Sequence, residues 1–439
     1  YTLWHTLSLH DALPILKISH DFYLKPGITI NEVVVTGNLE GQGKALNQQK
    51  MALNLKNVVS SDLIGRFPDR NVAEALQRLP GINVERNRGE GSVIQLRGTP
   101  PGFTITTING EQIPSTVEDG ARYEELDLLP IDQVSSIELV KAITPENDID
   151  AIAGAINLKT TKAKKEDNKF RVEAGTGYNQ LSEKYNVIGS FSYNNRFINK
   201  EDDSGKLGVK IGGSLYNTQL SRDRLEIKDW KKQSFVNTDN ESYDAYVIGS
   251  KDLRHRDLLS FRSRQGIYSY IDYKFNEKTD MFLHLMHSKL TDDDIRRRNR
   301  YRPKIGEYLS PDTGLGGTIR RDITDRLIEK KITTVHLGGK IGFNLLNMDY
   351  SLFHSAAIRD YNSKISTFES EPFNFQIHNL NDIDVFVEAL DPEIDIHDPG
   401  LIKDFRFHYH DHSINRGSNS SFKVNFSYPF LLSSNETTL

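Results

Sequence analysis

Hydrophobic and polar positions follow two different patterns along the chain, and the change falls after residue 163. The first part mixes short β-branched runs with one helical segment, in which Asp69 or Asn71 caps apolar positions at helical spacing over residues 72–79. Asn109–Gly110 lies between two β-rich runs and is a strong signal for a tight hairpin. We therefore predict an α+β domain over residues 45–163.

The second part consists of short alternating runs, many of which end in aromatic residues. These runs occupy residues 170–179, 185–197, 206–217, 266–275, 279–290, 332–343 and 348–358. Short polar turns separate some of them, and we predict long loops at 219–262, 291–330 and 360–402. Alternation of short and long connections is typical of an outer-membrane β-barrel, whose strands face lipid on one side and a wet lumen on the other. A solenoid would instead show a fixed repeat, and none is evident.

The amino-acid composition excludes several classes of protein and of functional site. The chain has 439 residues, of which 37% are hydrophobic, and its apolar runs are too short for a membrane-spanning helix. The net charge of −5 argues against a nucleic-acid partner held by bulk charge. Cysteine is absent, which excludes disulfides, thiolate catalysis and cysteine-ligated metals. Because nucleophile-elbow, P-loop, zincin and dinucleotide motifs are also missing, we expect no enzymatic activity and no cofactor.

The N-terminal residues divide into three segments. Residues 1–15 lack signal-peptide features and resemble translated sequencing-adapter sequence, so we leave them out of the fold prediction. Residues 16–30 hold one strand-like run, and residues 31–37, NEVVVTG, form an apolar segment followed by a polar linker. That segment fits either an edge strand of a preceding domain or a strand that pairs with another protein's sheet edge. We expect the sequence to be a fragment.

Several motifs, in order, carry a family resemblance. They are NVAEALQRLPGINVERNRGEGSVIQLRG, ING and IDQVSSIELVKAITPENDIDAIAGAINLKT in the first part, and TDMFLHLMHSKLTDDDIRRRNRYRP in the second. With them, residues 31–439 resemble a TonB-dependent outer-membrane receptor, and the last motif is similar to the Xanthomonas/Caulobacter-type subfamily. One departure is Ala153, where the subfamily usually has glycine, and it puts a left-handed turn at that position in doubt.

The resemblance implies an architecture and partners. It implies an α+β plug domain (45–163) followed by an antiparallel transmembrane β-barrel, which has 22 strands in the family and of which residues 164–439 supply only the N-terminal part. Residues 16–30 resemble the end of a preceding β-domain, and residues 31–44 would be the TonB box and linker. The implied TonB box consists of Glu32, Val33, Val34, Val35 and Thr36. The implied partners are TonB with its ExbB/ExbD energy system, an extracellular solute and the lipid of a Gram-negative outer membrane.

The resemblance also implies site residues on the plug. Two loops would face outward, and their side chains best able to stack on or hydrogen-bond a solute are Phe103, Glu118, Arg122 and Tyr123. Each of them also fits an ordinary solvated loop. Arg97 matches the arginine of the family's RG motif, and we expect it to pair with barrel carboxylates and hold the plug in place.

Two charged stretches of the second part need separate interpretations. FRFHYHDHS places His408, His410 and His412 on one face of an extended strand, at a spacing that two metal-bound imidazoles could share. The alternative, which we favour, is a barrel strand with a polar lumen face and an aromatic lipid face. Asp292–Asp294, followed by RRRNR, indicates a solvated loop with internal pairing.

The expected function is active import of a scarce solute, energised by TonB. The resemblance leans toward an oligosaccharide or other large nutrient over a ferric siderophore. Two alternatives stay open, namely a signal-transducing receptor and the glycan-capture component of a surface degradation complex.

Overall fold

The computed structural model describes residues 42–428, except for 53, 61–68, 118–120, 143–149, 161–162, 164–167, 200–203, 237–241, 304–307, 311–312, 344–345 and 380–383. The chain divides into two units, Tyr1–Leu39 and Glu40–Leu439. The first unit lies outside the described residues, and so do the predicted TonB box and the segments 1–15 and 16–30. Among the described residues, no helix is long and apolar enough to cross a membrane.

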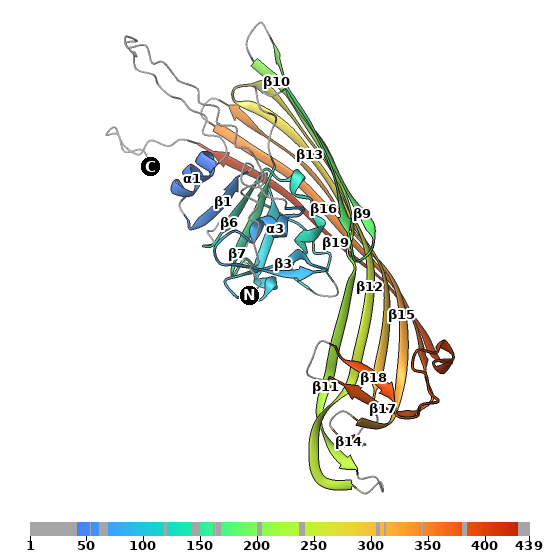
Figure 1. Cartoon of the computed structure of the whole chain (residues 1–439). Helices are drawn as coiled ribbons and strands as arrows, with labels where there is room; N and C mark the ends of the chain where they lie inside the picture. The colour runs from blue at the N-terminus through green and yellow to red at the C-terminus, as the bar shows by residue number, and fades with distance from the viewer. Residues whose placement is uncertain are drawn as a thin grey trace, which may run out of the picture. The chain divides into compact units, whose positions relative to one another are not determined.

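The predicted α+β domain is present, and it is built around a five-stranded sheet (Figure 1). Its elements are α1 (Gln42–Lys50), β1 (Lys56–Ser60), α3 (Val72–Leu76), β2 (Ile82–Asn87), β3 (Glu90–Leu96), the 3-10 turns η1 (Pro101–Phe103), η2 (Leu126–Leu128) and η3 (Ile131–Gln133), β4 (Thr104–Ile108), β5 (Glu111–Gln112), β6 (Ser136–Val140) and β7 (Gly154–Lys159). The sheet order is β1-β6-β7-β4-β5, and β2 and β3 form a separate hairpin. Helix α1 begins inside the segment predicted as linker.

Local sequence signals explain several of these elements. Asn71 caps α3, because its side chain accepts a hydrogen bond from the Glu74 backbone N–H at 3.0 Å. Asn109 and Gly110 have φ values of 52° and 89°, as a two-residue hairpin turn between β4 and β5 requires. The left-handed backbone of the AIAG segment lies at Gly154 (φ 144°), whose added Cβ would come within 2.4 Å of the Val140 carbonyl oxygen. Ala153 therefore does not disturb the turn.

The second part of the chain forms one large sheet, which is antiparallel except for a single parallel bridge between β11 and β14. Its strands are β8 (Lys169–Asn179), β9 (Lys184–Asn199), β10 (Ser204–Gln219), β11 (Arg222–Val236), β12 (Ser242–Asn276), β13 (Thr279–Arg302), β14 (Tyr308–Ser310), β15 (Thr313–Phe343), β16 (Leu346–Glu369), β17 (Phe373–His378), β18 (Phe386–Ala389) and β19 (Asp404–Ser427), with a 3-10 turn η4 (Pro399–Leu401) before β19. Long antiparallel pairs join β8-β9-β10-β12-β13-β15-β16-β19 in that order.

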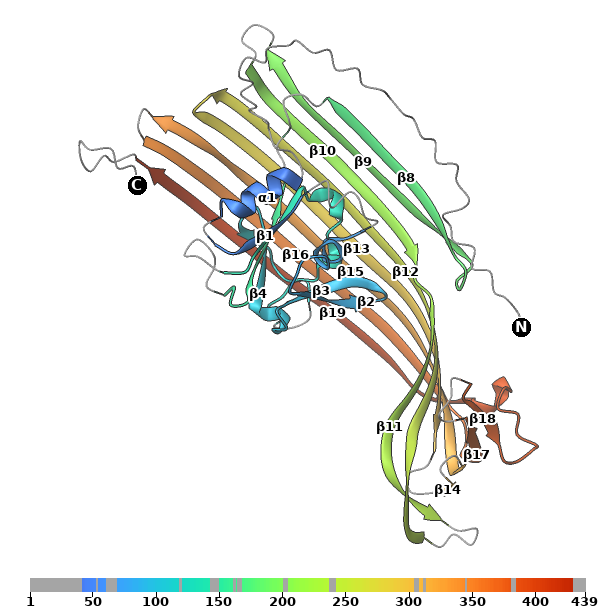
Figure 2. The same cartoon turned by 60° about the vertical axis from the view of Figure 1, so that its left-hand side comes forward.

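The three predicted long loops are wrong in most of their length. Residues 219–262 include β11 and the first part of β12, and residues 291–330 continue β13 and begin β15. Residues 360–402 contain the end of β16 and the short strands β17 and β18. Figure 2 shows these strands extending well beyond the level of the α+β domain. These stretches carry charged residues on both faces, and the charges interrupt the apolar–polar alternation from which the other strands were predicted.

The large sheet has two chemically different faces. We call the face that contacts the α+β domain the inner face and the opposite one the outer face. Because side chains alternate along a strand, the contacts of Asp292 and Asp294 with that domain assign the even-numbered residues of β12, β13 and β15 to the inner face. The outer face carries a belt of exposed apolar side chains: Phe170, Val172, Val187, Phe191, Leu215, Ile267, Ile271, Leu285, Val335, Leu352, Phe422 and Phe426.

Candidate functional site

The α+β domain meets the large sheet through close polar contacts. The Gln133 side-chain nitrogen donates to the His287 carbonyl oxygen at 3.1 Å, and the Ser288 hydroxyl donates to the Gln133 side-chain oxygen at 2.8 Å. Gly266 permits this approach, because an added Cβ would lie 2.5 Å from the Gln133 side-chain nitrogen. A larger residue there would push the domain off the sheet.

Charged side chains form a second set of contacts, which we call the buried ionic layer. The interface contains five cations and five carboxylates joined by ion pairs: Arg88, Arg262, Arg264, Arg326 and Lys330, with Glu90, Glu125, Asp127, Asp292 and Asp294. Arg88 and three of the carboxylates come from the α+β domain, and the rest come from β12, β13 and β15. The layer is therefore balanced in charge.

Distances within the layer are those of strong ion pairs. Arg262 lies 2.9 Å from Glu90 and 2.6 Å from Asp292, and Arg264 lies 2.5 Å from Glu90. Arg88, in the turn between β2 and β3, lies 2.9 Å from Asp292 and 2.5 Å from Asp294. Arg262 and Asp292 are only 1% exposed, so the pairs are shielded from water. Removing one partner would leave a buried charge uncompensated.

Two of the three carboxylates that the α+β domain contributes to this layer are held ionised, whereas burial raises the pKa of the third, Glu125. Burial by itself would raise the pKa of Glu90, but the Arg264 and Arg262 guanidinium groups outweigh it and hold that pKa below its ordinary value. Burial would likewise raise the pKa of Asp127, and the charges of Lys330, Arg262 and Arg264 lower it instead. Both groups therefore carry negative charge at neutral pH.

A further contact lies on β19, beside a polar cavity. Glu111 accepts a hydrogen bond from the Ser421 hydroxyl at 2.6 Å and pairs with Lys423 at 2.9 Å. The Asn419 side chain donates to the Gln112 carbonyl oxygen at 3.3 Å. A cavity of about 980 Å³ lies between these residues and the five-stranded sheet, and its lining includes Lys56, Asn157 and Lys159. Polar groups of both domains thus border an accessible space.

Three of the four residues predicted to contact solute lie within the described part. Phe103 is 41% exposed, Arg122 is exposed and Tyr123 is half-buried, whereas Glu118 lies outside the described residues. The two predicted loops come together, because a Cβ added to Gly102 would lie 3.8 Å from the Arg122 Cβ. The Ser115 hydroxyl also donates to the Tyr123 carbonyl oxygen at 2.6 Å. Their contact with a solute stays a prediction.

Arg97 and Arg88 lie at opposite ends of the β2–β3 hairpin. Arg97 is exposed, has a φ of 56°, and its N–H donates to the Gly81 carbonyl oxygen at 2.7 Å. Within the described residues it forms no ion pair with the large sheet, so its role as a lock stays a prediction. Arg88 forms such pairs, and the sequence prediction missed it.

The prediction of a solvated loop at Asp292–Asp294 is wrong. Both carboxylates lie on β13, 1% exposed, and face the α+β domain. The following arginines at 296, 298, 300 and 302 share their face, since they continue the same period of two. This D-x-D-x-R-x-R-x-R-x-R spacing was a usable signal for a strand with one strongly charged face.

The three histidines of β19 lie on the outer face. Residues 419, 421 and 423 of β19 contact the α+β domain, so the even-numbered side chains point the other way. His408 shares a hydrogen bond of 3.0 Å with Ser366, His410 one of 3.0 Å with Asn362, and His412 one of 3.0 Å with Asp360. The predicted polar lumen face is thus reversed. Across the described residues, no group of three metal-binding side chains could hold an ion.

Comparison with known proteins identifies the α+β domain. Residues 49–155 match the family described as TonB-dependent Receptor Plug Domain. The match covers β1 to β6, the first two residues of β7 and the domain's residues in the buried ionic layer.

The chain also has weak similarity to several solved structures of receptors and transporters. A mutant of the ferric enterobactin receptor PfeA from Pseudomonas aeruginosa, in complex with enterobactin, is 13% identical with a TM-score of 0.39, covering 74% of this chain and 60% of that one. The outer membrane transporter YddB from Escherichia coli is 10% identical with a TM-score of 0.38, covering 84% and 58%. The siderophore receptor PirA from Acinetobacter baumannii is 14% identical with a TM-score of 0.31, covering 79% and 60%. The chain thus spans about 60% of the length of these structures.

Proposed function

We propose that the chain is the N-terminal part of a TonB-dependent receptor that imports a scarce solute across the outer membrane of a Gram-negative bacterium. The observation that carries the proposal is the plug-domain match over residues 49–155, on a domain anchored by ions to the inner face of an antiparallel sheet. The expected partners are TonB, with its ExbB/ExbD energy system, an extracellular solute and membrane lipid.

The outer face of the sheet supports a membrane location. Its belt of exposed apolar side chains runs across eight neighbouring strands, opposite the face that carries the plug. Val172 opposes Phe191, Leu285 opposes Val335, and Leu352 opposes Phe422. An apolar band on the outside and polar residues on the inside is the pattern of a transmembrane β-barrel strand.

The segment Glu32–Thr36 is the proposed TonB-binding strand. It is apolar and β-branched, it precedes the plug in the sequence, and the polar residues that follow connect it to the plug as a linker. Such a segment can add to the edge of another protein's sheet through main-chain hydrogen bonds. A pull on it would reach the plug through α1 and β1, which lies at one edge of the five-stranded sheet.

Solute capture is assigned to the loops that hold Phe103, Arg122 and Tyr123, together with the inner face beyond them. Phe103 is an exposed aromatic side chain and Arg122 an exposed cation on adjacent loops. An oligosaccharide or another large polar nutrient would suit such a combination of stacking and hydrogen bonding, and a ferric siderophore is the competing solute.

The test uses the full-length receptor in an outer membrane and the purified periplasmic domain of TonB. We expect the intact receptor to bind TonB and a deletion of Glu32–Thr36 to abolish binding. A matched deletion of residues 37–41 shortens the chain by the same length and should leave binding measurable. Equal binding by both deletions would place the TonB-binding strand elsewhere, and no binding by the intact receptor would overturn the proposed import.

A further inference from the structure

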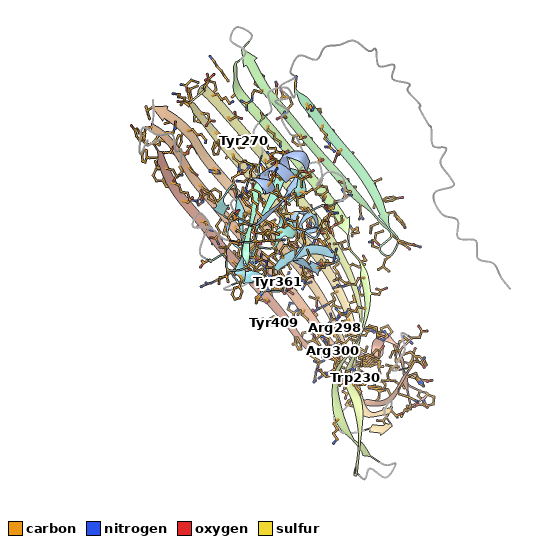
Figure 3. The ribbon with its side chains drawn as sticks, turned by 90° about the vertical axis from the view of Figure 1, so that its left-hand side faces the viewer. Trp230, Tyr270, Arg298, Arg300, Tyr361 and Tyr409 are labelled. Atoms are coloured by element: carbon orange, nitrogen blue, oxygen red, sulfur yellow. The ribbon has the colours of Figure 1, made fainter. Side chains whose placement is uncertain are left out.

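We propose that the inner face beyond the plug binds a solute that carries several carboxylate or phosphate groups. This inference rests on the proposed receptor function and specifies its substrate class. The surface, which we call the arginine face, consists of Arg222, Arg224, Arg254, Arg256, Arg296, Arg298, Arg300 and Arg320. Figure 3 places Arg298 and Arg300 between the plug and the far end of the strands.

Strand register brings these arginines into three adjacent rows. In the first row Arg254, Arg300 and Arg320 stand side by side on β12, β13 and β15. The second row holds Arg224, Arg256 and Arg298, and the third holds Arg222, Leu258 and Arg296. Neighbouring strands are about 4.8 Å apart, and like charges placed directly opposite repel each other. Anions placed between these arginines would therefore reduce the repulsion within the rows.

The sheet itself supplies too few of those anions. The same three rows contain three carboxylates, Glu226, Asp322 and Glu369, against eight arginines. A fourth carboxylate, Asp252 in the adjoining row, pairs with Arg254 and Arg300. Glu226 is already shared, at 3.0 Å from Arg224 and 2.8 Å from Arg256. This excess of positive charge is a local property of the arginine face, because the whole chain has a net charge of −5.

The arginines of the third row have the fewest carboxylate partners. Arg296 donates to the Thr324 hydroxyl at 2.9 Å, and within the described residues it has no ion pair. Arg222, at the other end of that row, opposes the apolar Leu258 and has none either in this part of the chain. Two guanidinium groups beside the buried ionic layer therefore retain hydrogen-bonding capacity for an outside ligand.

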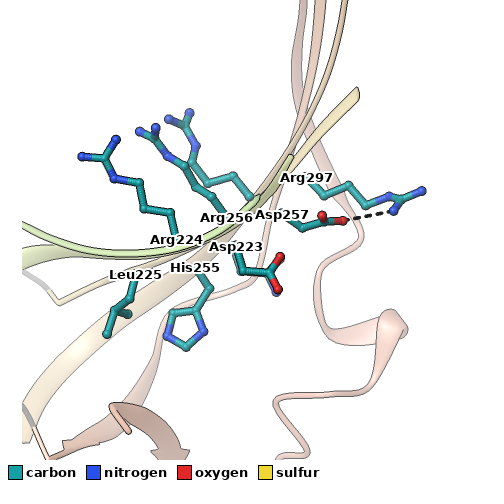
Figure 4. Close-up of a pocket in the computed structure, with 9 residues that line it drawn as sticks. Asp223, Arg224, Leu225, His255, Arg256, Asp257 and Arg297 are labelled. Carbon is teal, nitrogen blue, oxygen red and sulfur yellow. Dashed lines mark hydrogen bonds and ion pairs between the residues drawn. The ribbon is translucent and has the colours of Figure 1, made fainter. Parts of the chain in front are cut away.

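The outer face of the same strands lacks such an excess. Arg297 follows Arg296 in sequence, points to the opposite face and pairs with Asp257 at 3.3 Å. Figure 4 shows Arg224 and Arg256 projecting to one side of the ribbon, and Leu225 and His255 to the other. The Asp257–Arg297 ion pair is drawn there as a dashed line. The positive charge is thus directed to the side on which the plug lies.

The chemistry of the ligand follows from the geometry. Arginine forms paired, planar hydrogen bonds with carboxylate and phosphate, so both groups suit these rows. Same-face neighbours along a strand are about 6.5–7 Å apart and cross-strand neighbours about 4.8 Å apart. A solute with several acidic groups at such intervals can engage several rows at once, whereas a single small anion engages one. An acidic oligomer is therefore favoured over a neutral sugar.

The experiment is calorimetric titration of the full-length receptor, purified in detergent, with three probes. Trigalacturonate carries carboxylates, inositol hexakisphosphate carries phosphates, and maltotriose is neutral. We expect at least one anionic probe to bind at least about tenfold more tightly than maltotriose, and added salt to weaken it. The tighter of the two anionic probes identifies the acidic group. Equal affinity for maltotriose, or no binding of either anionic probe, would overturn the inference.

Matched variants connect that binding to the arginine face. Arg296→Gln should weaken binding of the anionic probe about tenfold, and Arg296→Lys should recover part of the loss. Arg297→Gln, one residue away on the outer face, should stay within about twofold of the parent. Equal losses in the two glutamine variants would contradict the proposal. Titration needs no TonB, so lost anion selectivity with intact TonB binding overturns this inference alone, whereas intact anion binding without TonB binding overturns the import.

Discussion

Two neighbouring regions of the inner face differ in their balance of positive and negative side chains. In the buried ionic layer five cations meet five carboxylates, and Arg262 and Asp292 are 1% exposed. In the arginine face eight arginines meet four carboxylates, Asp252, Glu226, Asp322 and Glu369, and Arg298 and Arg300 are 15% and 17% exposed. Charges shielded from water must be paired, whereas an excess is tolerated where water and ligands reach it. The balanced region anchors the plug, and the unbalanced one is free to bind a solute.

The largest expected effect comes from unbalancing the buried layer. Arg262→Met removes the cation that pairs with Asp292, Asp127 and Glu90. This loss should weaken plug attachment by about 3–5 kcal/mol. Proteolysis of the plug over a urea series measures this in the full-length receptor. Arg262→Lys keeps the charge and should lose less, so an equal loss in both variants would attribute the effect to packing rather than to charge.

Glu124, a buried carboxyl with no ion pair among the residues that the structure describes, should give a pH effect of intermediate size per pH unit. Burial raises the pKa of Glu124 to about 8, with Thr106 as its hydrogen-bond partner. The folded plug therefore keeps a proton that the unfolded chain releases above its ordinary pKa of 4.5. Stability should fall as pH rises from about 5 to 8, by up to about 1.4 kcal/mol per pH unit.

The control for that pH effect is Glu124→Gln, which cannot ionise. Hydrogen exchange of β4 in the full-length receptor, compared between the two proteins at each pH, isolates the contribution of this carboxyl. The parent should lose protection with rising pH relative to the variant. Parallel pH profiles would contradict the assignment of a neutral Glu124.

Neutralising one member of the arginine face should change stability much less. Arg300 loses its pair with Asp252 in Arg300→Gln, but repulsion from Arg254 and Arg320 is relieved at the same time. We expect a change within about 1 kcal/mol in the same urea series. A loss as large as that of Arg262→Met would remove the distinction between the two regions.

The smallest effect is expected on the outer face. Arg297 is 59% exposed and its partner Asp257 is 41% exposed, so solvent screens the pair. Arg297→Gln should leave the urea midpoint of plug proteolysis unchanged within error. A measurable shift would show that charge on the outer face also contributes to plug attachment.

Local patterns in the sequence were enough to predict much of the fold. The Asn109–Gly110 hairpin, the Asn71 cap and strands β8, β9 and β10 are confirmed, with strand ends within about two residues of the expected ones. Each of these depends on interactions between residues that are close in sequence or on an apolar–polar alternation. The same reasoning also locates the runs 266–275, 279–290, 332–343 and 348–358 within β12, β13, β15 and β16. It fails over most of the predicted long loops, where charged residues occupy both faces of the strands.

The ionic contacts could not be predicted because their partners are remote in sequence. Arg88 and Asp294 are 206 residues apart, and only the strand register decides that Asp294 faces the plug. A register difference of one residue would exchange the two faces, which is why His408, His410 and His412 were assigned to the lumen and lie outside it. Arg97, chosen for its motif, and Arg88 share one hairpin, and the direction of that hairpin decides which of them meets the sheet.

The contrast between the two regions is tested most directly by hydrogen–deuterium exchange of residues 82–96 in full-length Arg262→Met and Arg300→Gln receptors. These residues form the β2–β3 hairpin, which carries Arg88 and Glu90 into the buried layer. We predict faster exchange of this hairpin in Arg262→Met and parental exchange in Arg300→Gln. Faster exchange in both variants, or in neither, would contradict the division into an anchoring layer and a ligand-binding face.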